Sequence, residues 1–191
     1  ILTKNDIDEL TAIVKNQDIL ILSDEVYEHL VYDGREHHIM ARYPELRERS
    51  FITVSFGKLF HATGWKIGYC LAPANLMQEF RKIHQFLVFS VNTPMQAGIA
   101  EYLKDDNVYN GLAAFFQQKR DYFSRGLQQS RFKILPSQGS YFQCVSYQGL
   151  TDERDMDLAI RITREFGVAS IPVSAFYSKG TDHHILRFCF A

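Results

Sequence analysis

Short apolar runs of strand length, alternating with helical segments, constrain the fold of this chain more than any other feature. Residues 4–16 are expected to form a helix capped by Thr3, because apolar residues recur on one face. Residues 19–23 and 51–55 are mostly continuous apolar runs, which are typical of strands buried on both faces of a parallel sheet. A helix followed by such strands predicts an α/β fold with a mainly parallel sheet.

The remaining segments indicate two parts. Residues 67–72 read as a third strand, and helices are expected over 76–86 and 94–104. A long helix over about 113–129 then leads into a different pattern of alternating short elements, namely strands at 132–135, 141–145, 168–172 and 185–190 and a helix over 151–166 capped by Thr151 or Asp152 and ended by Gly167. We therefore expect a larger domain over 1–112 and a smaller α+β domain over 113–191.

Charge and hydropathy exclude several classes of partner. The 191 residues carry a formal net charge of −1 and contain no basic run, so we expect no nucleic-acid partner. The longest apolar stretches have the length of strands and are too short to span a bilayer, so no membrane partner is expected either. The hydrophobic content of 46% is enough to bury a core in one or two domains.

The cysteine and histidine patterns argue against disulfide and metal sites. Three cysteines are odd in number and widely spaced: Cys70, Cys144 and Cys189. That spacing indicates neither a disulfide framework nor a thiolate zinc site, and it favours a reducing, cytoplasmic compartment. The pairs 37–38 and 183–184 are adjacent histidines, which point to opposite sides of an extended chain and are expected in solvated loops.

A lysine and an aspartate follow two of the predicted strands. Lys58 comes just after residues 51–55, and Asp24 ends the run that begins at Ile19. Open α/β sheets place ligand-binding groups at the carboxyl ends of their strands. An amine that can form an imine, together with an acid for a ring nitrogen, fits pyridoxal phosphate. Taken alone, Lys58 reads as a surface lysine in a strand-to-helix loop, and Asp24 could equally be a helix cap.

Four other side chains could complete such a site. Tyr27 could donate a hydrogen bond to the phenolic oxygen of the cofactor, or it could be a tyrosine at the edge of the core. Ser55 and Lys66 could bind a phosphate, although Lys66 could also be a solvated strand residue. Arg187 lies between apolar residues and needs a partner, for which a substrate carboxylate and an internal salt bridge are both open.

Six segments occur in an order that resembles the class I/II, fold-type-I, PLP-dependent aminotransferases, where PLP is pyridoxal 5′-phosphate. The nearest subgroup is that of the methionine and kynurenine (glutamine-phenylpyruvate) aminotransferases. The segments are residues 23–28, 55–58, 63–69, 92–96, 136–142 and 186–188. The resemblance implies an aminotransferase that acts on an amino acid and a 2-oxo acid, a large PLP-binding domain followed by a small domain, and a cytoplasmic homodimer.

The resemblance also implies a role for each side chain. Lys58 would hold PLP and shuttle the proton between the substrate Cα and the cofactor C4′. Asp24 would bind the pyridine nitrogen and Tyr27 the phenolic oxygen. Ser55 and Lys66 would bind the phosphate, and Arg187 the substrate α-carboxylate. Phe60 and His61 would line an apolar or aromatic side-chain pocket. Many relatives carry arginine where this chain has Lys66, which weakens bidentate phosphate recognition.

The N-terminal half of the family pattern and its C-terminal helix are absent, so we expect this chain to be a window from a longer protein. Two alternatives to an aminotransferase stay open. A carbon–sulfur β-lyase would use the same lysine and the same cofactor chemistry. A non-catalytic PLP-fold module acting in regulation or dimerisation would not need the combination of lysine and aspartate.

Overall fold

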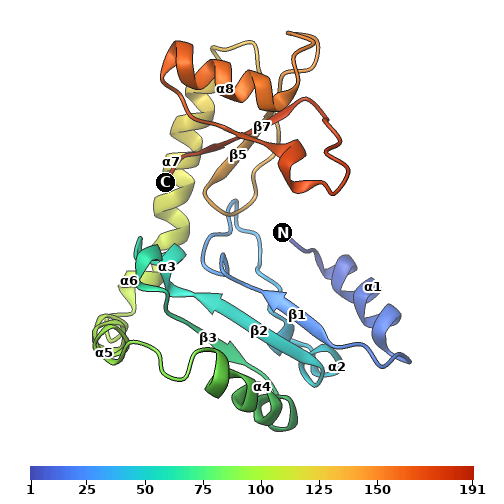
Figure 1. Ribbon diagram of the computed structural model, residues 1–191, viewed down its shortest axis with the longest axis vertical. Coiled ribbons are helices and arrows are strands. Elements are labelled where there is room, and N and C mark those ends of the chain that lie inside the picture. Colours follow the sequence, from blue (N-terminus) through green and yellow to red (C-terminus); the bar gives the residue numbers. More distant parts are fainter. The chain divides into compact units, whose positions relative to one another are not determined.

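Each part of the chain is built on its own β-sheet. The computed structural model describes residues 1–191, and these divide into two units, residues 1–112 and residues 113–191 (Figure 1). The first unit has a three-stranded sheet and the second a four-stranded sheet, with helices in both. None of the helices combines the length and the apolar character that crossing a membrane would require.

The sheet of the first unit is mixed. Its order is β1 (Ile21–Asp24), β2 (Ser50–Ser55) and β3 (Gly68–Leu71). β1 and β2 are parallel as expected, whereas β3 is antiparallel to β2. The connection from β2 to β3 contains only the short helices α3 (Phe56–Leu59) and η2 (Thr63–Trp65), which turn the chain back. A parallel arrangement would need a longer crossover element.

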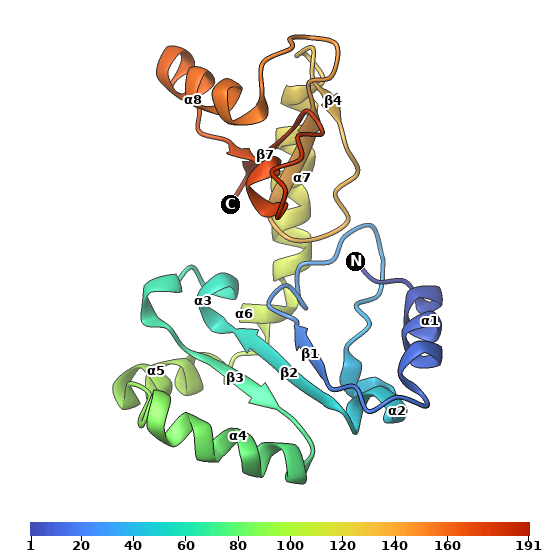
Figure 2. The same ribbon diagram turned by 45° about the vertical axis from the view of Figure 1, so that its right-hand side comes forward.

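Helices contact both faces of this sheet. α1 (Lys4–Val14) is capped by Thr3 as expected, in a capping box with Asp6, and packs Ile7 and Val14 into a core with Ile52. The core also contains Met40 of η1 (Met40–Arg42) and Leu46 of α2 (Pro44–Arg47). On the opposite face, Phe80 of α4 (Ala74–Leu87) lies 6.2 Å, ring to ring, from Phe51. Figure 2 shows α1 and α4 on different sides of the three strands.

The prediction that the first strand is buried on both faces is wrong. Residues alternate along β1, so that Ile21 is partly buried while Leu22 is 76% exposed. β1 is an edge strand of the sheet, and α1 packs on only one of its faces. Successive side chains of a strand point to opposite faces, so Leu22 and Asp24 share the exposed face.

The second unit is an antiparallel sheet with two helices. Its order is β4 (Lys133–Ile134), β5 (Phe142–Ser146), β7 (Ile185–Cys189) and β6 (Ile171–Pro172), and all pairs are antiparallel. α7 (Leu112–Leu127) and α8 (Asp155–Phe166) supply residues that pack on the core around Val145, Leu158 and Phe188. α8 ends at Gly167, whose φ of 68° is the left-handed cap expected from the sequence.

α8 begins later than predicted. Its first residue is Asp155, and its N-cap Arg154 makes no side-chain capping bond. The hydroxyl of Thr151 is hydrogen-bonded to Glu153 instead, at 3.0 Å and 3.3 Å from Oε1 and the backbone N. A local turn therefore occupies the segment that was expected to be the first turn of the helix. The other elements are α5 (Thr93–Tyr102), α6 (Asn107–Asn110) and η3 (Val173–Phe176).

Candidate active site

The carboxyl ends of β1 and β2 bring two of the predicted site residues to one face of the sheet. Asp24 is paired in register with Thr53, and the backbone N–H of Glu25 donates to the Thr53 carbonyl at 2.8 Å. Cross-strand partners share a face, and residues two apart along a strand do so as well. Asp24, Thr53 and Ser55 therefore project from the same face. Ser55, the last residue of β2, makes no capping bond to the helix that follows.

Lys58 lies in α3, which follows β2 directly. Its side chain is half-buried, and its ammonium forms no hydrogen bond or ion pair within the chain. The protein's own backbone requires glycine at position 57. A Cβ at Gly57 would lie 2.8 Å from Thr63 Cα, and Thr63 Oγ1 donates to the Gly57 carbonyl at 3.1 Å. This contact fixes α3 against η2.

Lys66 is not in a strand, contrary to one of the two readings of its position. It caps η2 in a left-handed conformation with φ 55° and ψ 43°, which is uncommon for a non-glycine residue. The chain then enters β3 at Gly68, the register partner of Ser55. Gly68 cannot carry a side chain, because its Cβ would lie 2.2 Å from the Val54 carbonyl oxygen. Lys66 therefore lies two residues before Gly68, which pairs with Ser55 at the end of β2.

Tyr27 and Phe60 occupy surroundings that the sequence did not specify. Tyr27 is half-buried in the turn after β1, where its carbonyl accepts the N–H of Leu30 at 2.9 Å. Phe60, expected to line a substrate pocket, lines a small cavity of the first unit, where it stacks on Phe56 at 6.0 Å and meets Tyr102 edge-on at 5.2 Å. Its ring therefore packs against two aromatic residues of the first unit.

Glu25 is a buried carboxylate that our reading of the sequence missed. It is 4% exposed, although it follows Asp24 directly. Its oxygens accept hydrogen bonds from Ser23 Oγ at 3.0 Å and from Met40 N at 3.0 Å, and His37 Nε2 lies 2.8 Å away. The histidine pair at 37–38 lies in a loop as expected, but both side chains are only partly exposed and have partners in the chain, His37 in Glu25 and His38 in Tyr43 at 2.6 Å. No local pattern signalled this contact, because the partners lie 12 and 15 residues from Glu25.

Glu25 should make the stability of the protein depend on acid. Burial raises the pKa of its carboxyl, but the hydrogen bonds from His37, Met40 and Ser23 lower that pKa by more, so the net pKa lies below the ordinary value. A lowered folded-state pKa contributes stability above the unfolded pKa, and that contribution is lost as pH falls through the folded pKa. We expect Glu25→Gln to reduce the free energy of unfolding by about 1–3 kcal/mol at pH 7.

Urea unfolding of the parent and of Glu25→Gln across the pH range tests this expectation. The difference in unfolding free energy should be constant near neutrality and should shrink below the ordinary glutamate pKa. Glu45→Gln is the matched control, because Glu45 is exposed in α2. A difference that stays constant down to the lowest pH would contradict the assignment of this stability to the Glu25 carboxylate.

Arg187 has no acidic partner within the chain. It lies in β7, paired with Cys144 on one side and Ile171 on the other. Its Cζ lies over the rings of Phe142 at 4.0 Å and Phe176 at 4.8 Å, and its Nε is buried without a hydrogen-bond acceptor. The internal salt bridge left open by the sequence is therefore absent. A buried donor without a partner is costly, so this nitrogen is available to an acceptor from outside the chain.

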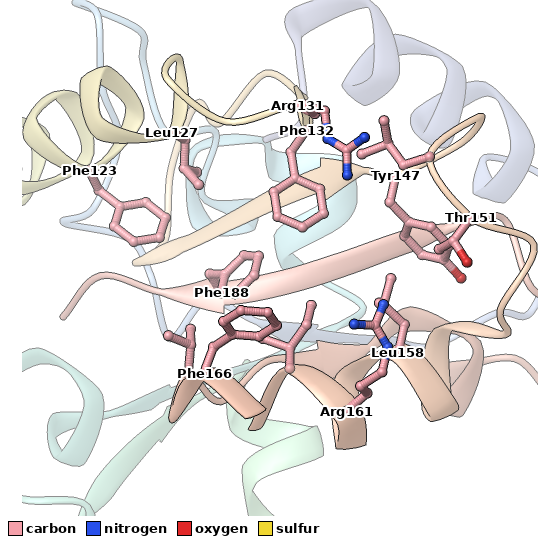
Figure 3. A pocket seen from close by; sticks show the side chains of 13 residues that line it. Phe123, Leu127, Arg131, Phe132, Tyr147, Thr151, Leu158, Arg161, Phe166 and Phe188 are labelled. Carbon is pink, nitrogen blue, oxygen red and sulfur yellow. The ribbon is translucent and has the colours of Figure 1, made fainter. Parts of the chain in front are cut away.

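A separate apolar pocket of about 410 Å³ lies in the second unit, between α7, the strands and α8 (Figure 3). Phe123, Phe132, Leu158 and Phe188 line it. One of its two arginines, Arg161, is bound to Glu153 and Glu165. The lining contains no thiol, carboxylate or histidine. Its two hydroxyls have partners within the chain, since Tyr147 donates to the Glu153 carbonyl at 3.0 Å and Thr151 donates to Glu153 Oε1 at 3.0 Å.

The thiols and possible metal ligands form no cluster. All three cysteines are free thiols, and burial raises the pKa of both Cys70 and Cys144. No group of three or more histidine, cysteine, aspartate or glutamate side chains is arranged to hold a metal ion. The predicted site residues Asp24 and Ser55 lie at the ends of β1 and β2, Lys58 lies in α3 just beyond, and Arg187 lies in β7.

Comparison with known proteins identifies the family. Residues 1–191 match the family Aminotransferase class I and II. The chain belongs to this family. Its members use pyridoxal phosphate, and their fold is the α/β fold type I expected from the sequence.

Relatives of this aminotransferase-family chain have several named activities. The methionine aminotransferase of Escherichia coli (strain K12) is 43% identical over 93% of this chain and 46% of its own length. A kynurenine–oxoglutarate transaminase of Dictyostelium discoideum is 34% identical over 98% of this chain and 49% of its own. The chain thus spans about half the length of the curated relatives it matches.

Solved structures agree with these relatives. A crystal structure of an Escherichia coli protein with a methionine aminotransferase function superposes with a TM-score of 0.96 at 41% identity, covering 100% of this chain and 50% of the other. N-succinyldiaminopimelate aminotransferase from Mycobacterium tuberculosis gives a TM-score of 0.92 at 30% identity, with coverages of 100% and 50%. The subgroup expected from the ordered motifs is therefore confirmed.

Proposed function

We propose that this chain carries the lysine-bearing half of a PLP-dependent aminotransferase, which moves an amino group between an amino acid and a 2-oxo acid. The family match over residues 1–191 is the observation that carries the proposal. The names of the relatives support methionine or kynurenine-like amino acids as substrates, and the same proposal includes aromatic amino acids. Residues 1–112 would be the C-terminal portion of the large domain and residues 113–191 the small domain, in a cytoplasmic homodimer.

The residues present fit the cofactor. PLP, when bound, supplies an electron sink for the charge that develops at the substrate Cα. Lys58, whose amine has no partner in the chain, would hold the cofactor and move the proton at the substrate Cα. Asp24 would keep the ring nitrogen protonated, and Tyr27 would donate to the phenolic oxygen. Ser55 and Lys66 would bind the phosphate as hydroxyl donor and point charge.

Arg187 would bind the α-carboxylate that amino acids and 2-oxo acids share. Its guanidinium can form a bidentate pair with a carboxylate, and no acid of the chain competes for it. Arg187 is thus suited to a ligand group that both substrates of an aminotransferase present. The same arrangement would also serve a β-lyase, because β-elimination differs in the group that leaves Cβ and not in how the substrate carboxylate and PLP are held.

Product analysis separates the two reactions. The natural polypeptide that carries this chain should transfer the amino group of methionine to a 2-oxo acid. It should release little pyruvate and ammonia from cystathionine. Release of pyruvate without amino transfer would favour the carbon–sulfur β-lyase. A non-catalytic module would show neither reaction, and a protein without visible absorption after incubation with PLP would not be a PLP enzyme.

Replacing Arg187 by lysine should weaken the binding of amino acids and 2-oxo acids alike. Lysine keeps the charge but cannot reproduce the planar fork of the guanidinium. We expect a loss of about 2–5 kcal/mol if the pair with the carboxylate is desolvated. Titration with methionine and with its decarboxylated amine measures the effect, and the amine should be little affected. Equal weakening of both ligands would mean that Arg187 is structural and that the carboxylate binds elsewhere.

A further inference from the structure

A second buried carboxylate, Asp155, lies in the same unit as Arg187 and has no part in the roles proposed so far. It is the first residue of α8 and is 1% exposed. Its Oδ1 accepts the hydroxyl of Ser174 at 2.6 Å, and its Oδ2 accepts the backbone N–H of Ser174 at 2.7 Å. Both carboxylate oxygens are therefore committed to one residue of η3.

The short helix η3 connects this carboxylate to Arg187. It follows β6 directly, and Ile171 of β6 is the register partner of Arg187. Two residues beyond Ser174, Phe176 presents the ring over which Arg187 Cζ lies at 4.8 Å. Phe176 is 62% exposed, so little packing of its own holds the ring in place. The position of the ring depends on the backbone of η3, which Asp155 fixes through Ser174.

The neighbouring segment is fixed from the same point. The backbone N–H of Asp155 donates to Asp182 Oδ2 at 2.8 Å, and Asp182 Oδ1 accepts the N–H of His184 at 2.7 Å. The hydroxyl of Tyr147 reaches the same Asp182 oxygen at 3.3 Å. Both ends of the connection from η3 to β7 are thus hydrogen-bonded at the start of α8. A connection that is hydrogen-bonded at both ends has less conformational freedom than one that is not.

We propose that Asp155 is a positioning residue for the carboxylate-binding arginine, acting through Ser174 and the ring of Phe176. A guanidinium stacked on an aromatic ring keeps its plane and directs its N–H groups sideways. A bidentate pair with a carboxylate requires that orientation. The proposal rests on the role of Arg187 proposed above and adds to it the residues that hold its orientation.

The test compares a carboxylate with its uncharged amide on the natural polypeptide that carries this chain. The probes are 3-phenylpropanoate and 3-phenylpropanamide, which differ only in the group that Arg187 would bind, and their dissociation constants are measured by calorimetry. Asp155→Asn, Ser174→Ala and Phe176→Leu should each weaken the carboxylate about 3- to 30-fold and the amide much less. The KM for methionine should rise by a similar factor, with a smaller change in kcat.

Two controls separate positioning from general damage. Glu153→Gln alters a carboxylate two residues before Asp155 that binds Arg161 and not η3, so the affinity for the carboxylate should be unchanged. Phe176→Tyr keeps the ring and should behave like the parent. If Asp155→Asn does not fold, Ser174→Ala still tests the link to Asp155, and the exposed Phe176, changed to Leu or Tyr, tests the role of the ring.

The outcomes are distinct. Equal weakening of the acid and the amide in the variants would overturn the proposal and leave Asp155 a structural residue. A parent protein that binds 3-phenylpropanoate no better than the amide, and in which Arg187→Lys changes neither, would overturn the role of Arg187 itself. If Arg187→Lys loses the preference for the acid over the amide but Phe176→Leu retains it, only the positioning role of Asp155 would be rejected.

Discussion

Lys58→Ala should abolish measurable amino transfer while leaving the protein able to bind PLP. General acid–base groups contribute about 10²–10⁴-fold to turnover, and Lys58 is proposed to supply both the attachment point and the proton transfer at the substrate Cα. Asp24, Ser55 and Lys66 remain in the variant, so the proposed contacts to the ring and the phosphate should remain. Steady-state turnover with methionine and equilibrium binding of PLP measure the two effects separately.

Chemical labelling gives a second measurement that does not depend on turnover. Borohydride treatment of the parent incubated with PLP should attach the cofactor to the peptide that contains Lys58. Lys82→Ala is the matched control, because Lys82 is an exposed lysine of α4 paired with Glu79. It should retain both turnover and labelling at Lys58. Recovery of the label on any other lysine would refute the assignment.

Asp24→Ala should lower turnover by about 10²–10³-fold, the usual effect of removing one preorganised electrostatic partner of the reacting system. A carboxylate beside the ring nitrogen favours its protonated form, which an uncharged side chain cannot do to the same degree. Asp24→Glu should keep part of the activity because it keeps the charge. The measurements are kcat with methionine and the visible spectrum with PLP bound.

The structure gives Asp24 a local role that must be separated from its charge. Asp24 Oδ1 accepts the backbone N–H of Val26 at 3.2 Å, in the turn that leads to Tyr27. Asp24→Asn retains an oxygen for this bond and removes the charge, so it should unfold at the temperature of the parent and yet lose turnover. Near-parental turnover in Asp24→Asn and Asp24→Ala would mean that the ring nitrogen has another partner.

Local features of the chain were predictable from the sequence because short-range rules govern them. The capping box at Thr3, the left-handed Gly167 and the long helix α7 depend on residues within a few positions of one another. The same is true of Asp24 and Ser55 at the ends of their strands. The ordered motifs also led to the family, which the match over residues 1–191 shows.

Tertiary structure alone decided the features that depend on distant contacts. The sequence could not reveal that β3 is antiparallel, that Glu25 binds His37 and Met40, or that Asp155 holds η3 near Arg187. The partners in these contacts lie a dozen or more residues apart, and no periodicity in the sequence records their pairing. The amino-acid sequence alone thus determined which residue types lie at the strand ends. The packing of helices and loops decided which carboxylates are buried, because burial depends on partners that the local sequence does not record.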